Sequence, residues 1–138
     1  MQSYSTSTRV RYQETDQMGM AYHANYLVWM EIGRTEFFRE IGIPYKKFED
    51  SGIMLPVIEA KCTYKRSAVY DEVITIETSM VELSPVKIRA EYRLIKEDGD
   101  TAAEGYTMHA FVNLKGKAVN AKKNIPQIFS LLESYIGS

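Results

Sequence analysis

The first residues of the chain alternate between two kinds of side chain. One side of residues 4–12 carries Tyr4, Thr6, Thr8, Val10 and Tyr12, and the other carries Ser5, Ser7, Arg9 and Arg11. A period of two with several β-branched residues is typical of a β-strand. The pattern therefore predicts a strand over 4–12.

Residues 24–41 have a helical period instead. Tyr26, Met30, Gly33, Phe37 and Ile41 recur three or four positions apart. This spacing predicts an amphipathic helix, with Asn25 as N-cap or a start up to two residues earlier, ended by Gly42 and Pro44. Since a glycine lies within the apolar stripe, we expect a sheet to approach the helix closely there.

The period of two returns after residue 57, following a short helical turn and loop over 44–52. It persists through four segments, 57–65, 71–82, 86–97 and 101–114, and the sequence EDGD between the last two predicts a tight hairpin. Apolar faces are expected at Ile88, Ala90, Tyr92 and Leu94, and at Tyr106, Met108, Ala110 and Val112. Residues 124–138 predict a short terminal helix.

These elements predict an α+β fold, with an antiparallel sheet of about five to six strands wrapped around one long central helix. The length of 138 residues favours a single domain over 1–138, and 45% hydrophobic and 25% charged residues are ordinary globular values. A net charge of −1 gives no support for nucleic-acid binding. The lone Cys62, and the lack of an apolar signal or bilayer-spanning run, lead us to expect a cytoplasmic protein without stable membrane insertion.

The stretch ETDQMGMAYHANY, residues 14–26, is where we expect the chemistry. It places Asp16 after a strand and before a helix, with Gly19 allowing a sharp turn between them. A carboxylate beside the free N–H groups of a helix N-terminus can act on a carbonyl group and stabilise the resulting oxyanion. A loop aspartate can equally serve as a turn or capping residue, and the pattern alone leaves both interpretations open.

A resemblance to a known family favours the first interpretation. The pattern Y-x-E-T-D-x-M-G-x-x-Y-H-A-N-Y over 12–26, YLVWMEIGRTEFF over 26–38 and YKRSAVYDEVITIET over 64–78 together resemble the hotdog-fold thioesterases of the 4-hydroxybenzoyl-CoA thioesterase family. The resemblance covers essentially the whole chain. It implies a hotdog fold and an acyl-CoA thioesterase that needs no metal or cofactor, coenzyme A being part of the substrate.

The resemblance also implies roles for individual residues. Asp16 corresponds to the family's catalytic aspartate, as nucleophile or general base, and His23 to its backbone oxyanion donor, with an imidazole that could orient Asp16 or the substrate. We assign Gly19, Tyr22, Asn25 and Tyr26 to the substrate-binding surroundings. The candidate cations for the phosphates of coenzyme A are Lys65, Arg66, Lys87 and Arg89, although a solvated surface charge is the more common role for residues of this kind.

The acyl pocket and the remaining polar residues are less defined. Met18, Met20, Tyr22, Trp29, Met54 and Leu55 could line a pocket for a fatty chain or an aromatic ring. A metal site is not expected, because nothing pairs with Cys62 at ligand spacing and His109 alternates with apolar residues as a structural histidine would.

The resemblance also implies that the protein forms a dimer, or a dimer of dimers, with its active site between subunits. Apolar or β-branched residues opposite the main stripes, Val57, Val73, Thr75 and Ile95, are consistent with a covered outer surface. Two other functions share the fold: a non-catalytic module that binds acyl-CoA or a protein partner, and a hotdog dehydratase or hydratase. The presence of Asp16 argues against the non-catalytic module, because a protein that only binds has no need of this carboxylate. The motifs typical of hotdog dehydratases and hydratases are absent from the sequence, which argues against that function.

Overall fold

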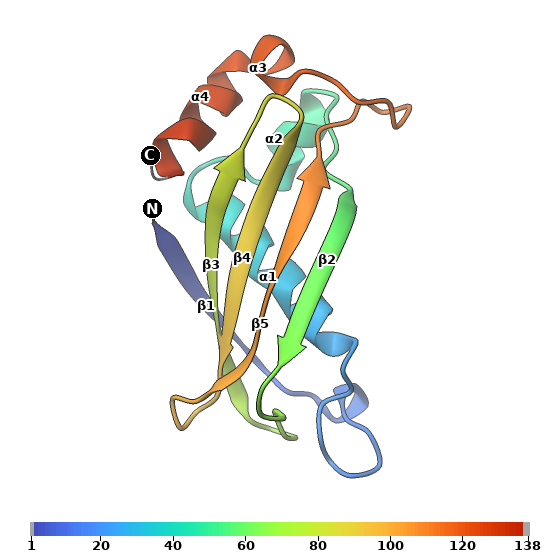
Figure 1. The fold of residues 1–138 in the computed structure, drawn as a ribbon, viewed down its shortest axis with the longest axis vertical. Coiled ribbons are helices and arrows are strands. Elements are labelled where there is room, and N and C mark those ends of the chain that lie inside the picture. The colour runs from blue at the N-terminus through green and yellow to red at the C-terminus, as the bar shows by residue number, and fades with distance from the viewer. Residues whose placement is uncertain (1, 137–138) are drawn as a thin grey trace.

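The computed structural model describes residues 2–136, in which five antiparallel strands pack against one long helix (Figure 1). The strands are β1 (Ser3–Arg9), β2 (Val57–Tyr64), β3 (Val73–Leu83), β4 (Lys87–Ile95) and β5 (Thr101–Ala110). The helices are α1 (Asn25–Glu40), α2 (Tyr45–Asp50), α3 (Ala121–Asn124) and α4 (Pro126–Tyr135), with a single 3-10 turn, η1 (Tyr12–Glu14). None of these helices is long and apolar enough to cross a bilayer.

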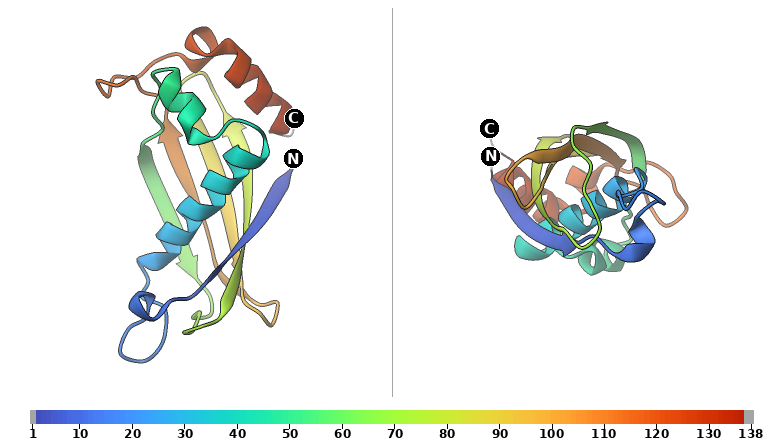
Figure 2. Two further views of the ribbon diagram at one scale, coloured as in Figure 1. Left: turned by 180° about the vertical axis from the view of Figure 1, so that it is seen from behind. Right: turned by 90° about the horizontal axis from the view of Figure 1, so that it is seen from below.

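The sheet has the strand order β1-β3-β4-β5-β2, so the two edge strands are the first and second in the chain. Helix α1 crosses one face of the sheet diagonally, and Figure 2 shows it from behind, with the sheet curling around it. Helix α4 lies beside the turn between β3 and β4 (Figure 1). The predicted α+β arrangement of a sheet around one central helix is therefore confirmed.

The apolar stripe of the helix faces the sheet as predicted, and all five of its residues are buried. A Cβ atom added to Gly33 would lie 2.6 Å from Cγ2 of Ile76 and would also overlap the hydroxyl of Thr78. Both are side chains of β3. The expected close contact between helix and sheet is thus confirmed, and it needs a residue without a side chain.

The strand faces are only partly as predicted. Ile88, Ala90, Tyr92 and Leu94 are buried beneath α1, as expected. In β5, however, the predicted face was wrong: its inner residues are Ala103, Thr107 and His109, while Tyr106, Met108 and Ala110 face outward. The pairing with β4 sets this, since Thr107 lies opposite Ala90 and His109 lies opposite Ile88. Thr107 and His109 can be buried on this inner face because hydrogen bonds within the fold offset the cost of removing their polar atoms from water.

The first strand ends earlier than predicted. Beyond Arg9, the N–H of Val10 donates to Glu72 at 2.8 Å and the chain turns into η1. Tyr12 is consequently 76% exposed instead of lying on the inner face. The turn forms because the carboxylate of Glu14 accepts the N–H of Arg11 at 2.8 Å, a local contact that a period of two does not reveal.

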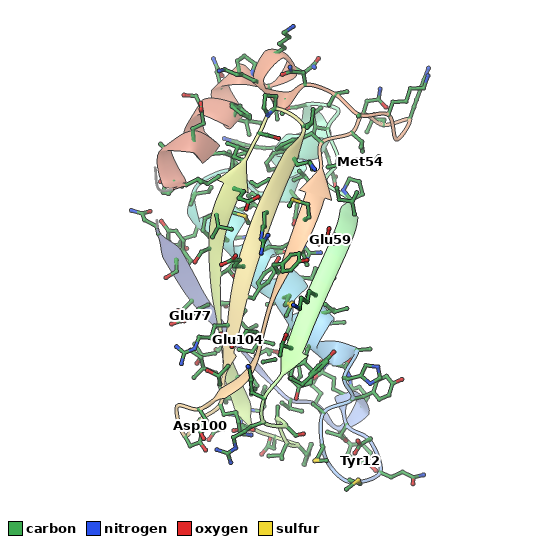
Figure 3. All side chains as sticks on the ribbon, viewed as in Figure 1. Tyr12, Met54, Glu59, Glu77, Asp100 and Glu104 are labelled. Atoms are coloured by element: carbon green, nitrogen blue, oxygen red, sulfur yellow. The ribbon has the colours of Figure 1, made fainter. Side chains whose placement is uncertain are left out.

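The outer face of the sheet is largely polar. Arg89 pairs with Glu91 and Arg93 with Glu77, at 3.3 and 3.7 Å. Figure 3 views this face, with Glu59, Glu77 and Glu104 labelled on three strands. Thr75 and Ile95 do lie here, opposite each other, whereas Val57 pairs with His109 and belongs to the inner side. The expected apolar outer surface is therefore small.

Candidate functional site

The stretch that carries Asp16 is a small hairpin loop between η1 and α1. The N–H of Asp16 donates to the carbonyl of Met20 at 2.8 Å, and the N–H of Gly19 donates back to the carbonyl of Asp16 at 3.1 Å. Gly19 has φ +76°, a left-handed conformation that glycine adopts at little cost. The sequence therefore folds locally into a tight turn, with the carboxylate at its start.

The carboxylate of Asp16 is exposed and has two distinct oxygens. Its Oδ1 accepts the N–H groups of Met18 at 2.8 Å and Met20 at 3.2 Å, so this oxygen stabilises the turn. For Oδ2, no hydrogen bond to any residue in 2–136 is found. The turn-forming role is thus real, but it uses only one oxygen and leaves the other available to a substrate or a water molecule.

Glu14, which sequence reasoning did not single out, anchors the loop to the helix. Its side chain is almost completely buried, and its Oε2 accepts the indole N–H of Trp29 at 3.0 Å. Its carbonyl accepts the N–H of Tyr22 at 2.8 Å and the side-chain amide of Asn25 at 2.9 Å. Burial acts to raise the pKa of Glu14, but donation from Arg11 and Trp29 outweighs it, and the pKa lies below its ordinary value.

The start of α1 leaves backbone donors unused. The turn before it is closed by the N–H of Asn25 bonding to Tyr22, and within the described residues no partner is found for the N–H of His23 or Ala24. The prediction of Asn25 as N-cap was wrong: the capping position is Ala24, without a side-chain cap, and Asn25 instead binds Glu14. The residues directly before α1 therefore offer free N–H groups at the end of the Asp16 loop.

Aromatic side chains surround His23. The ring of Tyr22 lies 4.5 Å from the imidazole, and Tyr64, at the end of β2, donates its hydroxyl to the carbonyl of His23 at 3.1 Å. Tyr26 is buried and packs against Tyr64 with ring centres 5.0 Å apart. The imidazole itself is exposed. Tyr64 was not predicted, because its contact with His23 spans 41 residues.

A hollow of about 410 Å³ lies beside the carboxylate. It is lined by Tyr12, Thr15, Asp16, Gln17, Gly19 and Tyr70. The rings of Tyr12 and Tyr70 meet edge to face at 5.9 Å. Figure 3 labels Tyr12 at the same end of the molecule as Asp100 and at the opposite end from Met54. Asp16 and Gly19 thus share a solvent-accessible hollow, whereas Tyr22, Asn25 and Tyr26 line the neighbouring helix start.

The four candidate cations lie at opposite ends of the sheet. Lys65 and Arg66 follow β2 directly at the end that holds Asp16, but Lys65 approaches Glu104 at 3.7 Å and Arg66 is bound by Asp98 and Asp100. Lys87 begins β4 at the other end. Its neighbour Arg89 stacks over the ring of Tyr106 at 4.0 Å on the outer face. A single chain therefore does not gather these four residues.

Two further side chains are part of the interior. Trp29 is fully buried and bonded to Glu14, so it cannot line an open pocket, unlike the exposed Met18 and Met54. His109 accepts from Thr107 at Nε2 (2.7 Å) and donates from Nδ1 to the carbonyl of Leu55 (3.0 Å), which confirms it as structural. Within residues 2–136 no group of three or more potential metal ligands is found.

Comparisons with known proteins agree with this architecture. Residues 10–130 match the thioesterase-like superfamily. The chain is 35% identical over 118 residues to the Bacillus subtilis protein YneP (85% of this chain, 86% of that one). It is 31% identical over 94 residues to the acyl-CoA thioesterase YbgC of Haemophilus influenzae (67% and 69%). The structure of a DHNA-CoA thioesterase from Staphylococcus aureus superposes with a TM-score of 0.92 at 28% identity, over 96% of this chain and 89% of that one, which supports the hotdog fold.

Proposed function

Because this chain belongs to the thioesterase-like superfamily, we propose that it hydrolyses acyl-CoA thioesters to a free acid and coenzyme A at the Asp16 loop. The observation that supports the proposal is the hydrogen bonding of the Asp16 carboxylate. One carboxylate oxygen holds the turn, the other has no partner among the described residues, and free helix N–H groups lie nearby. Water is the second reactant, and the proposed steps use only groups of this chain.

Asp16 can act in either of two ways. As a nucleophile, Oδ2 attacks the thioester carbonyl, the thiolate of coenzyme A leaves, and water then hydrolyses the resulting anhydride. As a general base, Oδ2 removes a proton from a water molecule while that water attacks the same carbonyl. Single turnover in ¹⁸O-labelled water tests the nucleophile route, because label enters Asp16 only when water attacks the Asp16 carbonyl of the anhydride, which the general-base route never forms.

Negative charge on the carbonyl oxygen must be stabilised along both routes. The unpaired N–H of His23 at the positive end of α1 is suited to this task, since preorganised backbone donors cost no reorganisation during the reaction. The hydroxyl of Tyr64 donates to the carbonyl of His23, so β2 holds the backbone directly after this donor, at the His23–Ala24 peptide. The exposed imidazole of His23 adds a polar group that can orient substrate.

We further propose that a second copy completes the site by covering β2. This strand is an edge of the sheet, and seven of its eight residues are exposed in one chain. Exposed apolar side chains, Leu27, Val28, Val57, Ile58 and Tyr64, lie on it and on the adjoining start of α1. An open edge strand with apolar neighbours favours pairing with another strand. The resulting dimer would also bring cations from both ends of the sheet toward one substrate.

The phosphates of coenzyme A require cations near the mouth of the site. Lys65 is the strongest candidate in the same chain, because its ion pair with Glu104 is long and exposed. Arg66 is already satisfied by two carboxylates and would have to exchange them. Lys87 and Arg89 could contribute only from the partner copy.

Asp16→Asn tests the proposal directly. Asparagine keeps an oxygen that can accept from Met18 and Met20, so we expect the turn and the melting temperature to be preserved. The kcat for thiol release should fall by at least about 10²-fold, while the dissociation constant of acyl-CoA stays within about tenfold. Asp50→Asn, an exposed aspartate on α2, is the matched control and should keep wild-type kcat.

Normal turnover by a well-folded Asp16→Asn variant would remove Asp16 from catalysis. Acyl-CoA binding by the wild type without any thiol release would favour the non-catalytic binding module. In that case Asp16 would serve only to stabilise the turn, through the bond from the N–H of Met18 to Oδ1.

Wild-type thiol release should be screened over short, medium, long and aromatic acyl-CoAs. The exposed Met18 and the half-buried Met20, which flank Gly19 in the Asp16 loop, can adapt to either kind of acyl group.

A further inference from the structure

Lys96 and Glu72 form a largely buried ion pair. The ammonium group of Lys96 is 2.8 Å from Oε1 of Glu72, and their side chains are 7% and 10% exposed. Among the described residues this is the one ion pair in which neither side chain exceeds 10% exposure. Burying two charges is costly, and an apolar pair of similar size often serves stability as well. The position of the pair therefore points to a role beyond stability.

Both charged groups bind the same turn, residues 67–72. Lys96 donates to the carbonyl of Ser67 at 2.6 Å, and Glu72 accepts the N–H of Val69 at 3.2 Å. The other carboxylate oxygen of Glu72 accepts the N–H of Glu97 at 3.2 Å, which ties the turn to the end of β4. The 67–72 turn is thus fixed at its beginning, middle and end.

The 67–72 turn also holds the Asp16 loop. The N–H of Ala21 donates to the carbonyl of Ala68 at 2.9 Å, and the N–H of Tyr70 donates to the carbonyl of Gly19 at 3.0 Å. Ala68 also donates its N–H to the hydroxyl of Tyr26 at 3.0 Å, so the same turn is attached to α1. Two of the residues that follow Asp16 are therefore bound to a turn whose own geometry depends on Lys96 and Glu72.

We propose that Lys96 and Glu72 form a positioning clamp that fixes the Asp16 carboxylate relative to the start of α1. This inference rests on the proposed function, since it assigns the pair a role in thioester hydrolysis. Neither residue contacts the reacting atoms. A displacement of about 1 Å at a reacting group can cost up to about 10²-fold in rate, so a clamp of this kind would act on kcat.

The test compares Lys96→Met, Glu72→Gln and the double variant. Each single variant should lower kcat by about 10- to 100-fold with KM within about twofold, and the double variant should lose no more than the larger single loss, because the two residues act as a unit. Lys46→Met breaks an exposed ion pair with Asp50 on α2 and is the control; it should keep wild-type kcat. Glu72→Gln retains an acceptor for Val69 and serves if Lys96→Met does not fold.

Hydrogen exchange supplies a readout that does not depend on turnover. The amides of Ala21 and Tyr70 should exchange at least about tenfold faster in Lys96→Met, while amides within α1 keep their protection. Unchanged kcat despite this loosening would overturn the positioning role, as would losses that multiply in the double variant. Absence of thiol release by the wild type would overturn the clamp together with the proposed function. The other outcomes of this experiment bear on the clamp alone.

Discussion

His109 shows how a single residue can combine an ordinary strand position with an unusual environment. It lies beneath α1, 3% exposed, between the hydroxyl of Thr107 and the carbonyl of Leu55. Burial, with the nearby charge of Arg34 as a smaller contribution, lowers its pKa from 6.5 to about 4, although its bond to Leu55 opposes the shift. The imidazole is therefore neutral in the folded protein at any pH well above 4.

This pKa predicts a pH dependence of stability. Below pH 6.5 the unfolded chain binds a proton at His109 that the folded chain does not take up until about pH 4. Stability from this residue is therefore fully present above pH 6.5 and falls as the pH drops from 6.5 toward 4, by about 3 kcal/mol in total. Urea unfolding of the wild type and His109→Gln at several pH values measures the difference.

His109→Gln should flatten the dependence of the unfolding free energy between pH 6.5 and 4. Equal slopes for wild type and His109→Gln would show that His109 takes up its proton in the folded state.

At the scale of elements, the position of helix α1 on the sheet depends on its apolar stripe and on the missing side chain of a glycine within that stripe. Gly33 lets the helix approach β3. Gly105 in β5 is required mainly by the neighbouring strand, since a Cβ there would overlap the backbone carbonyl of Lys61 in β2, and it would also lie 2.8 Å from Cε of Met30 on the helix. The sequence pattern indicated the first contact. Nothing local marked Gly105, whose role follows from the pairing of β5 with β2.

Substitution of Gly33 tests this packing. Alanine would gain about 1 kcal/mol of helix propensity, but overlap with Ile76 and Thr78 should outweigh that gain. We expect Gly33→Leu to lower the free energy of unfolding by about 1–3 kcal/mol or more. Glu40→Ala, at the exposed end of the same helix, should stay within about 0.5 kcal/mol in the same urea titration. A Gly33→Leu variant as stable as wild type would contradict the packing.

At the scale of the whole molecule, the main unpaired surface of a single chain is the open edge of the sheet at β2. The other edge strand, β1, alternates between exposed and half-buried residues, whereas β2 is exposed along nearly all its length. The candidate site lies at one end of β2, where Tyr64 meets His23. Assembly and activity should consequently depend on the same strand.

Ile58→Lys tests that dependence by placing a charge on the exposed part of β2. We expect the wild type to be a dimer or tetramer at micromolar concentration by light scattering, and the variant to shift toward monomer with at least about tenfold lower kcat. Leu114→Lys changes an exposed residue away from β2 and should keep both the mass and the kcat. A monomeric wild type with full turnover would rule out a shared site.

The sequence by itself determined the main elements and the location of the candidate site. Period-two and helical patterns indicated the strands and α1 because side-chain direction is a local property of the backbone. Gly33 could be recognised because a glycine within the apolar stripe of a helix lowers helix stability, a cost that a closely packed neighbouring element can offset. The stretch around Asp16 was recognisable because a carboxylate, a turn glycine and a helix start are adjacent in the chain.

Only the tertiary structure decided which groups surround that stretch. The anchoring role of Glu14 requires Trp29, 15 residues away, and the orientation of His23 requires Tyr64. The inner face of β5 was misjudged because hydrogen bonds to Tyr92 and Leu55 make Thr107 and His109 acceptable in the core. Such contacts depend on strand register and on which distant turn meets which loop. These are properties of the folded chain, and no spacing along the sequence encodes them.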